Sequence, residues 1–182
     1  MGEVAYVVLF RGVGGATLLP VRELRAHLEE GGFRHVSTYI NSGNAVLASP
    51  MAEGEVAEHV TAIVRACMGF DKHVFVRSLA DWTASIEANP FVKAEAEPTK
   101  LHLYTLEREP EPEAVARLKA RAKGTERFAV RGRTLYLHTP DGMGTSLFAQ
   151  KIEPTLGLAA TARNWRTVLK LGEMLRKIPL LK

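Results

Sequence analysis

Cysteine is almost absent from this sequence. Its single cysteine, Cys67, cannot form a disulfide within the chain. Because Cys67 continues the helical spacing of Val56, Val60 and Val64, we expect a buried thiol and not a nucleophile. Long apolar runs are missing too: residues 4–10 are too few to span a membrane, and the basic start of a signal peptide is absent. We therefore expect a cytoplasmic protein without membrane contact.

The motifs of metal sites and of activated nucleophiles are also missing. The six histidines form no H-E-x-x-H pattern and no cluster with the cysteine, so the sequence predicts neither a metal nor a cofactor. Ser146 is not flanked by the G-x-S-x-G pattern of a nucleophile elbow, and we interpret it as a helix cap. No acid/base pair can be named from the sequence. Whether the protein catalyses a reaction is left open.

Composition and charge are those of a globular protein with a basic second half. Hydrophobic residues make up 46% of the 182 residues and charged residues 24%. The net charge of +4 is unevenly divided: residues 1–99 hold 8 Lys/Arg and 12 Asp/Glu, whereas residues 100–182 hold 16 and 8. This asymmetry favours an anionic partner for the second half, and a solvated basic face explains it equally well.

The first half alternates between strand and helix patterns. Strands are predicted at residues 4–10, 36–41, 44–49 and 73–77, and helices at 20–30 and 54–68. The order βαββαβ is that of a ferredoxin-like domain, in which two helices cover one face of an antiparallel sheet. A short helix at 79–88 ends before Asn89-Pro90, and the charged, alanine-rich residues 93–100 are expected to form a linker.

The second half restarts the same pattern. Strands are predicted at residues 101–106, 128–131 and 134–138, and helices at 111–123, after Ser146 and at 163–177. This half therefore repeats βαββα and closes with a helix instead of a fourth strand, an order that indicates an old duplication. We expect an α+β protein, a two-domain α/β sandwich, with a ferredoxin-like βαββαβ domain at 1–92, a linker at 93–100 and a related βαββαα domain at 101–182.

A glycine-rich loop, R-G-V-G-G at residues 11–15, lies between the first strand and the first helix. Backbone N–H groups of such a loop can converge on an anion, and Arg11 adds charge. Gly12 and Gly14 are explained as well by a turn that needs positive φ. The loop lacks the third glycine of a dinucleotide fingerprint and the Gly-Lys-Ser/Thr of a Walker loop.

Two further segments carry more polar groups than their turns require. In T-Y-I-N-S-G-N, residues 38–44, the side chains of Asn41, Ser42 and Asn44 surround the turn glycine Gly43.

In the second segment, Thr161 or Asn164 can cap the last helix, with Arg163 and Arg166 beside its start. Two arginines at the positive end of a helix are unfavourable unless an anion lies nearby, and a carboxylate of the chain itself could be that anion.

Several of these motifs together resemble one bacterial family known as domain of unknown function 1697. They are L-F-R-G at residues 9–12, T-Y-I-N-S-G-N, N-P-F at 89–91, L-Y-L-H-T-P-D-G-M-G-T-S at 135–146 and A-R-N-W-R-T-V at 162–168. The resemblance spans nearly the whole chain and implies a fold and boundaries, but no activity. The family loop reads R-G-x-N-x-G-G, whereas the loop at 11–15 is about two residues shorter and lacks the asparagine, which weakens a ligand role carried over for it.

Three functions follow as hypotheses. The preferred one is binding of a small anionic ligand, bearing phosphate or carboxylate, in a cleft between the halves. The residues expected to line this cleft are Arg11, Gly12, Gly14, Asn41, Ser42, Gly43, Asn44, Arg163 and Asn164. The second is nucleic-acid binding by the basic half, with Tyr104, Tyr136 or Trp165 stacking on bases. The third is a scaffold or protein-interaction module, for which turns, caps and solvated faces suffice.

Overall fold

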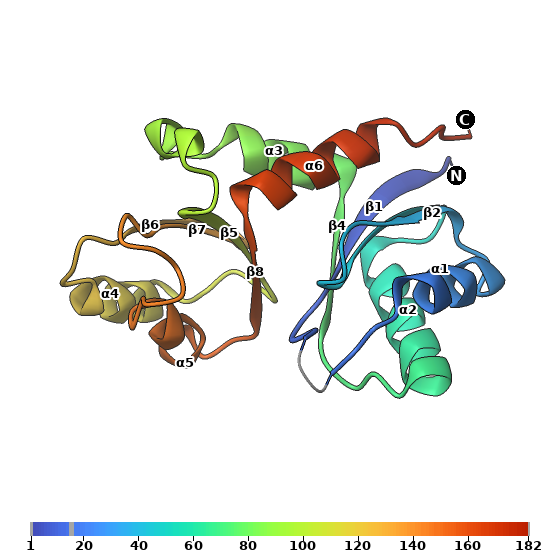
Figure 1. Cartoon of the computed structure of the whole chain (residues 1–182), viewed down its shortest axis with the longest axis horizontal. Helices are drawn as coiled ribbons and strands as arrows, with labels where there is room; N and C mark the ends of the chain where they lie inside the picture. Colours follow the sequence, from blue (N-terminus) through green and yellow to red (C-terminus); the bar gives the residue numbers. More distant parts are fainter. Residues whose placement is uncertain (1, 15–16, 182) are drawn as a thin grey trace. The chain divides into compact units, whose positions relative to one another are not determined.

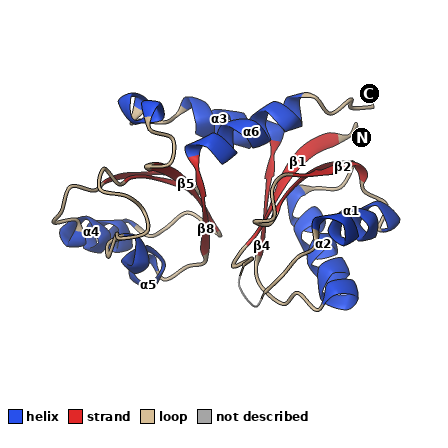
Figure 2. Cartoon of the chain, viewed as in Figure 1, coloured by secondary structure: helices blue, strands red, loops and turns tan. Residues whose placement is uncertain are grey.

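The computed structural model describes residues 2–14 and 17–181; Gly15 of the glycine-rich loop lies outside them. Helices and strands alternate along the chain (Figures 1 and 2). The first elements are β1 (Val4–Phe10), α1 (Val21–Glu30), β2 (Arg34–Thr38), β3 (Asn44–Ser49), α2 (Glu53–Met68), β4 (Val74–Ser78) and α3 (Leu79–Glu87). After the 3-10 helix η1 (Val92–Ala96) follow β5 (Leu101–Leu106), α4 (Pro112–Arg121), β6 (Arg127–Arg131), β7 (Thr134–His138), η2 (Ala149–Lys151), α5 (Ile152–Leu156), β8 (Ala160–Asn164) and α6 (Trp165–Arg176).

Contacts divide the chain into two units. The first unit comprises Met1–Ala84 and Lys170–Lys182, and the second comprises Ser85–Leu169. This division differs from the boundary expected at residues 93–100. Those residues contain part of η1, and the carbonyl of Pro98 accepts a hydrogen bond from the N–H of Trp165 at 3.0 Å, so they belong to the second unit.

Each unit has a ferredoxin-like sheet of four antiparallel strands. The strand orders are β2-β3-β1-β4 in the first unit and β6-β7-β5-β8 in the second. Helices α1 and α2 cover one face of the first sheet, and α4 and α5 cover one face of the second (Figure 1). Alternate residues of β1, Tyr6, Val8 and Phe10, face the core of the first unit, as the strand's period of two requires. The expected α+β class is confirmed.

The fourth strand of the second unit, β8, corrects the expected βαββαα order. The predicted helix at 163–177 includes the end of this strand, but α6 begins only at Trp165. The strand is short, and Ala160 and Ala162 face the core with small side chains, so no alternation of large apolar residues marks it. The order βαββαβα therefore occurs twice along the chain.

The repeat extends to the start of the helix that follows each fourth strand. In the first unit, Ser78 Oγ accepts a hydrogen bond from the N–H of Asp81 at 3.1 Å. In the second, Asn164 Oδ1 accepts one from the N–H of Thr167 at 3.0 Å. Each acceptor is the last residue of its strand and caps the helix after it. Asn164 is thus the helix cap, whereas the alternative cap, Thr161, lies within β8.

One burial expectation for α2 is wrong. Cys67 is exposed, although Val56, Val60 and Val64 are buried as expected. The buried stripe of α2 advances by four residues at each step, and Cys67 falls one position short of its continuation at residue 68.

The described helices include none that is both long and apolar enough to cross a membrane.

Candidate functional site

Three segments of the first unit meet at one corner: the end of β1, the β2–β3 hairpin tip and the start of β4. The N–H of Phe10 donates to the carbonyl of Gly43 at 2.9 Å, and the N–H of Arg11 donates to the carbonyl of His73 at 3.1 Å. We call residues 10–14, 42–44 and 72–73 the open corner. The glycine-rich loop and the hairpin tip, which the sequence suggested separately, lie together here.

Gly43 makes this contact possible. It has a φ of +76°, and a Cβ at this position would lie 2.7 Å from Val13 Cγ2 and 3.0 Å from the carbonyl oxygen of Phe10. Only glycine combines this backbone conformation with so close an approach. The hairpin tip therefore packs directly onto the end of β1.

Asn44 has a structural role at the hairpin tip. The residue is 1% exposed, and Nδ2 donates to the carbonyl of Tyr39 at 3.1 Å and to Ser42 Oγ at 3.0 Å. The hairpin connection, residues 39–43, is longer than a tight turn, and Asn44 closes it. Asn41 is exposed and lines a separate cavity of about 430 Å³ with residues 18–23.

Lys72 supplies charge to the open corner. Its Nζ donates to the carbonyl of Gly12 and to Thr17 Oγ1, each at 3.2 Å. No ion pair among the described residues includes Lys72, so no carboxylate neutralises it. Gly12 has a φ of +68°, which favours glycine, and a Cβ there would lie 3.1 Å from Nζ. Arg11 is exposed beside it.

Lys72 also lines a cavity of about 540 Å³ between α2 and the start of β4. The lining residues are Ala57, Glu58, Thr61, Ala62, Arg65, Asp71, Lys72, His73 and Val74. Arg65 and Asp71 form an ion pair of 2.6 Å within this lining. The cavity therefore adjoins the open corner through Lys72.

The second unit builds the same backbone corner with other side chains. The N–H of Leu106 donates to the carbonyl of Arg133 at 3.0 Å, and the N–H of Glu107 donates to the carbonyl of Ala159 at 2.9 Å. These bonds match those of Phe10 and Arg11 in the first unit. We call residues 106–108, 133 and 157–160 the filled corner.

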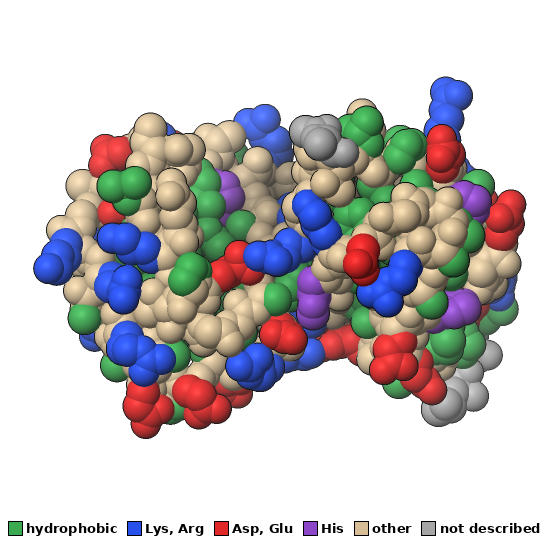
Figure 3. Space-filling model, turned by 90° about the horizontal axis from the view of Figure 1, so that it is seen from below, with side chains coloured by type: hydrophobic (Ala, Val, Ile, Leu, Met, Phe, Trp, Pro, Cys, Tyr) green, Lys and Arg blue, Asp and Glu red, His purple; other side chains and the backbone are tan. Residues whose placement is uncertain are grey.

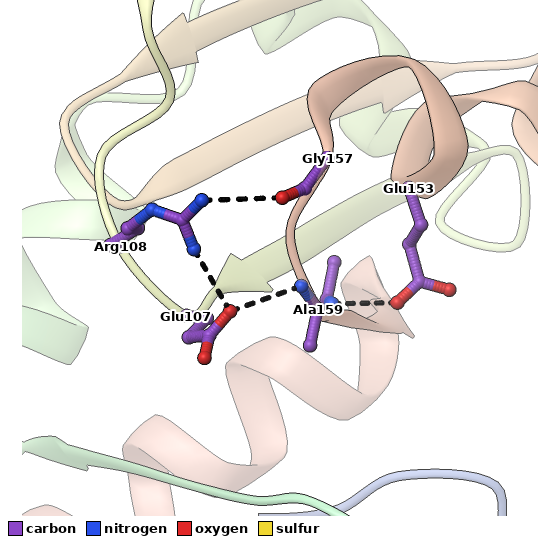
Figure 4. Close-up of polar contacts among 6 residues, drawn as sticks. Glu107, Arg108, Glu153, Gly157 and Ala159 are labelled. Carbon is purple, nitrogen blue, oxygen red and sulfur yellow. Dashed lines mark hydrogen bonds and ion pairs between the residues drawn. The ribbon is translucent and has the colours of Figure 1, made fainter.

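The charged side chains of the filled corner form hydrogen bonds with one another and with the nearby backbone (Figure 4). Glu107 Oε2 accepts hydrogen bonds from Arg108 at 3.2 Å and from the N–H of Ala159 at 3.3 Å. Arg108 also donates to the carbonyl of Gly157 at 3.2 Å. Glu153 Oε1 accepts the N–H of Ala160 at 2.7 Å. These contacts fix the turn that leads into β8, a structural task.

Matching the two corners shows where they differ. Arg108 and Arg133 in the filled corner occupy the places of Gly12 and Gly43 in the open corner. Arg108 has a carboxylate partner in Glu107, whereas Lys72 has none among the described residues. The first unit thus has glycines at these two positions and a lysine without a carboxylate partner among the described residues, where the second unit has the Glu107–Arg108 ion pair.

Arg163 and Asn164 belong to the second unit. Arg163 is partly buried in β8, and its Nη1 donates to Thr161 Oγ1 and to the carbonyl of Ala162, each at 2.8 Å. Burial lowers the pKa of Arg163 to about 10. The guanidinium therefore stays charged at neutral pH. The expectation that Arg163 and Asn164 share a ligand with the open corner stays a prediction.

The nucleic-acid hypothesis loses two of its supports. Tyr104, Tyr136 and Trp165 are 6%, 0% and 0% exposed, so the expectation that they stack on bases is wrong. The charge asymmetry shrinks when residues are counted by unit: the first unit holds 11 Lys/Arg and 10 Asp/Glu, the second 13 and 10. Within residues 2–14 and 17–181, no three His, Cys, Asp or Glu side chains are placed to hold a metal ion.

The fold and the paired corners define an α+β protein built from two ferredoxin-like units of the same strand order. The chain belongs to the family described as "Protein of unknown function (DUF1697)", whose model matches residues 4–136. The resemblance noted in the sequence is therefore confirmed. Comparison with curated proteins gives no match. Among solved structures, a conserved bacterial protein from Streptococcus pneumoniae matches with a TM-score of 0.70 and 22% identity, over 95% of this chain and 99% of that one. At this identity the likeness concerns the fold alone.

Proposed function

We propose that the protein binds a small anionic ligand at the open corner of its first unit. The observation that carries this proposal is the difference between the two corners, which share the same backbone hydrogen bonds. In the filled corner, Glu107 and Arg108 neutralise each other, and in the open corner Lys72 has no carboxylate among the described residues. The fold itself requires only the backbone hydrogen bonds of the corner. It therefore does not account for a lysine there without a carboxylate partner.

The backbone of the open corner favours an anion as well. Neither the N–H of Gly12 nor that of Val13 donates a hydrogen bond to another described residue. Gly12 has a φ of +68°, and successive N–H groups around such a residue can point to one anion. Hydrogen bonds to a charged group stabilise a complex by roughly 1.5 to 3 kcal/mol each. The corner holds no activated nucleophile, so the proposal concerns binding and leaves catalysis aside.

Isothermal titration calorimetry of the full chain tests the proposal. The ligands are inorganic phosphate, a sugar phosphate, a nucleotide and a dicarboxylate, and the variants are Lys72→Gln and Arg11→Gln. We expect binding of at least one of these anions that Lys72→Gln weakens about ten-fold or more, because a charged hydrogen bond is lost. Glutamine removes the charge but keeps a polar side chain with N–H donors.

The matched control is Lys123→Gln, an exposed lysine of the second unit, which should leave the affinity unchanged. No heat with any of the four anions, or equal losses for Lys72→Gln and Lys123→Gln, would remove the proposal. Arg163→Lys in the same titration tests the prediction that Arg163 contacts this ligand. A loss of affinity with unchanged thermal stability would support that prediction.

A further inference from the structure

Lys72 connects the open corner to a cavity that the anion proposal does not use. The volume of this cavity, about 540 Å³, lies within the range that holds small metabolites. A ligand with its anionic group at Lys72 can therefore extend between α2 and the start of β4. What this ligand is follows from the chemistry of the cavity lining.

Along α2, the charge of the cavity lining changes from negative at Glu58 to positive at Arg65. Glu58, Thr61 and Arg65 share one face of the helix, because they are three and four residues apart. Glu58 and Arg65 are separated by two turns, roughly 10 Å along the helix axis. Lys72 and His73 lie at the Arg65 end, where α2 ends and β4 begins. Figure 3 shows basic, acidic and histidine side chains close together on the first unit, in the right-hand part of the view.

The cation at this end suits a phosphate better than a carboxylate. The guanidinium of Arg65, whose planar fork matches a carboxylate, is held by Asp71 at 2.6 Å. Lys72 is a compact charge with three donors, of the kind that binds phosphate oxygens in many phosphate sites. Its Nζ already contacts Gly12, so a bound phosphate also reaches the N–H groups of the open corner.

The rest of the lining suits hydroxyl groups and not a nucleobase. Its apolar members, Ala57, Ala62 and Val74, are small, and the described lining holds no Phe, Tyr or Trp. The ring of His73 already packs against Phe75, with ring centroids 4.3 Å apart. A base needs an apolar or aromatic slot, which is missing here. The exposed carboxylate of Glu58 can accept hydrogen bonds from hydroxyl groups.

We infer that the ligand is a phosphomonoester of a small polyhydroxyl compound, with its phosphate at Lys72 and its hydroxyl groups at Glu58. This inference rests on the proposed function, because it places the ligand's anionic group at the same lysine. It adds the class of ligand and a second binding residue, Glu58, on α2.

Titration of the full chain tests the ligand class. The probes are a triose, a pentose and a hexose monophosphate, with inorganic phosphate, an unphosphorylated hexose and adenosine monophosphate for comparison. We expect at least one sugar monophosphate to bind ten-fold or more tightly than inorganic phosphate or adenosine monophosphate. Glu58→Ala should remove this advantage and leave the affinity for inorganic phosphate unchanged, whereas Glu113→Ala, an exposed glutamate of α4, should change neither.

The outcomes separate this inference from the proposed function. Should adenosine monophosphate or inorganic phosphate bind as tightly as every sugar monophosphate, or should Glu58→Ala have no effect, the ligand class is wrong. The proposed function would then still stand if Lys72→Gln weakens the binding of phosphate. Absence of binding by all the phosphates tested would overturn the ligand class, and absence of binding by the dicarboxylate as well would overturn both. Alanine is a good helix former, so Glu58→Ala should leave α2 folded.

Discussion

A single residue, Gly43, determines how closely the hairpin tip approaches the end of β1. Gly43→Ala would place a methyl group 2.7 Å from Val13 Cγ2 at a backbone φ of +76°. We expect this variant to lower the free energy of unfolding by about 2 to 4 kcal/mol, from backbone strain and overpacking together. Urea unfolding of the full chain measures the change.

The control for Gly43 is another hairpin glycine, Gly132. It also has a positive φ, +54°, but a Cβ there would meet no atom within 4 Å. Gly132→Ala should therefore show only the backbone cost, about 1 to 2 kcal/mol. Equal losses for the two variants would mean that the contact with Val13 adds nothing.

His102 makes the second unit sensitive to acid. It is 8% exposed, its Nδ1 has no partner in the part of the chain that the structure describes, and burial lowers its pKa to about 4. An unfolded histidine has a pKa of about 6.5. The folded state thus binds this proton less readily than the unfolded state. The contribution of His102 to the free energy of unfolding is complete above pH 6.5 and is lost as the pH falls towards 4.

The expected loss over this interval is about 3 kcal/mol, and His102→Leu should remove it. Chemical unfolding of both proteins at pH 7 and pH 4.5 measures the difference. His27→Gln, on α1, serves as the control and should keep the wild-type dependence on pH. An unchanged slope in His102→Leu would contradict the assignment.

At this scale, the sequence shows which residues are polar or flexible but not what they contact. Gly12 and Gly43 were predicted because tight turns need a positive φ, which glycine adopts readily. Asn44 was also chosen, but it is buried and serves the hairpin itself. Lys72 was missed because nothing in the neighbouring sequence distinguishes it. Only the pairing of β1 with β4 brings it to Gly12.

Among the elements, α6 has a cap that can be tested directly. Asn164 Oδ1 accepts the N–H of Thr167 at 3.0 Å. Asn164→Ala should lower the free energy of unfolding by about 1 kcal/mol, because this N–H loses its acceptor. Asn164→Asp keeps an acceptor at a helix N-terminus and should stay within a few tenths of a kcal/mol of the wild type. Thermal unfolding compares the three proteins, and similar losses for both variants would rule out capping as the role of Asn164.

Strands rich in large apolar residues were the predictable elements. The bounds of β5 and β7 agree with the sequence prediction because both are short, mostly apolar segments between turn residues. Strand β8 was not predicted because alanine and arginine favour helices, and no large apolar residue lies on its inward face. Local propensity thus indicated a longer helix, and pairing with β5 overrides it.

For the whole molecule, the order of elements was predictable and the division into units was not. The repeated βαββα order was predicted from periodicity, and in the structure the longer order βαββαβα occurs twice along the chain. The assignment of Lys170–Lys182 to the first unit could not be predicted from the sequence, because local sequence does not determine which unit a helix packs against. That assignment also moves the basic residues of the C-terminal segment into the first unit and so reduces the charge asymmetry.

A chain that ends at Leu169 tests this division. It lacks Leu171 and Leu175, which are fully buried, and Met174 and Ile178, which line a cavity of the first unit beside Val46. Loss of the two buried leucines alone should destabilise the first unit by about 3 to 6 kcal/mol. Hydrogen exchange followed by mass spectrometry should show faster exchange in β2 and β3, with little change in β6 and β7, because opening follows the stability of each cooperative unit. Equal acceleration in both sheets would mean that the chain unfolds as one unit and that the C-terminal segment stabilises all of it.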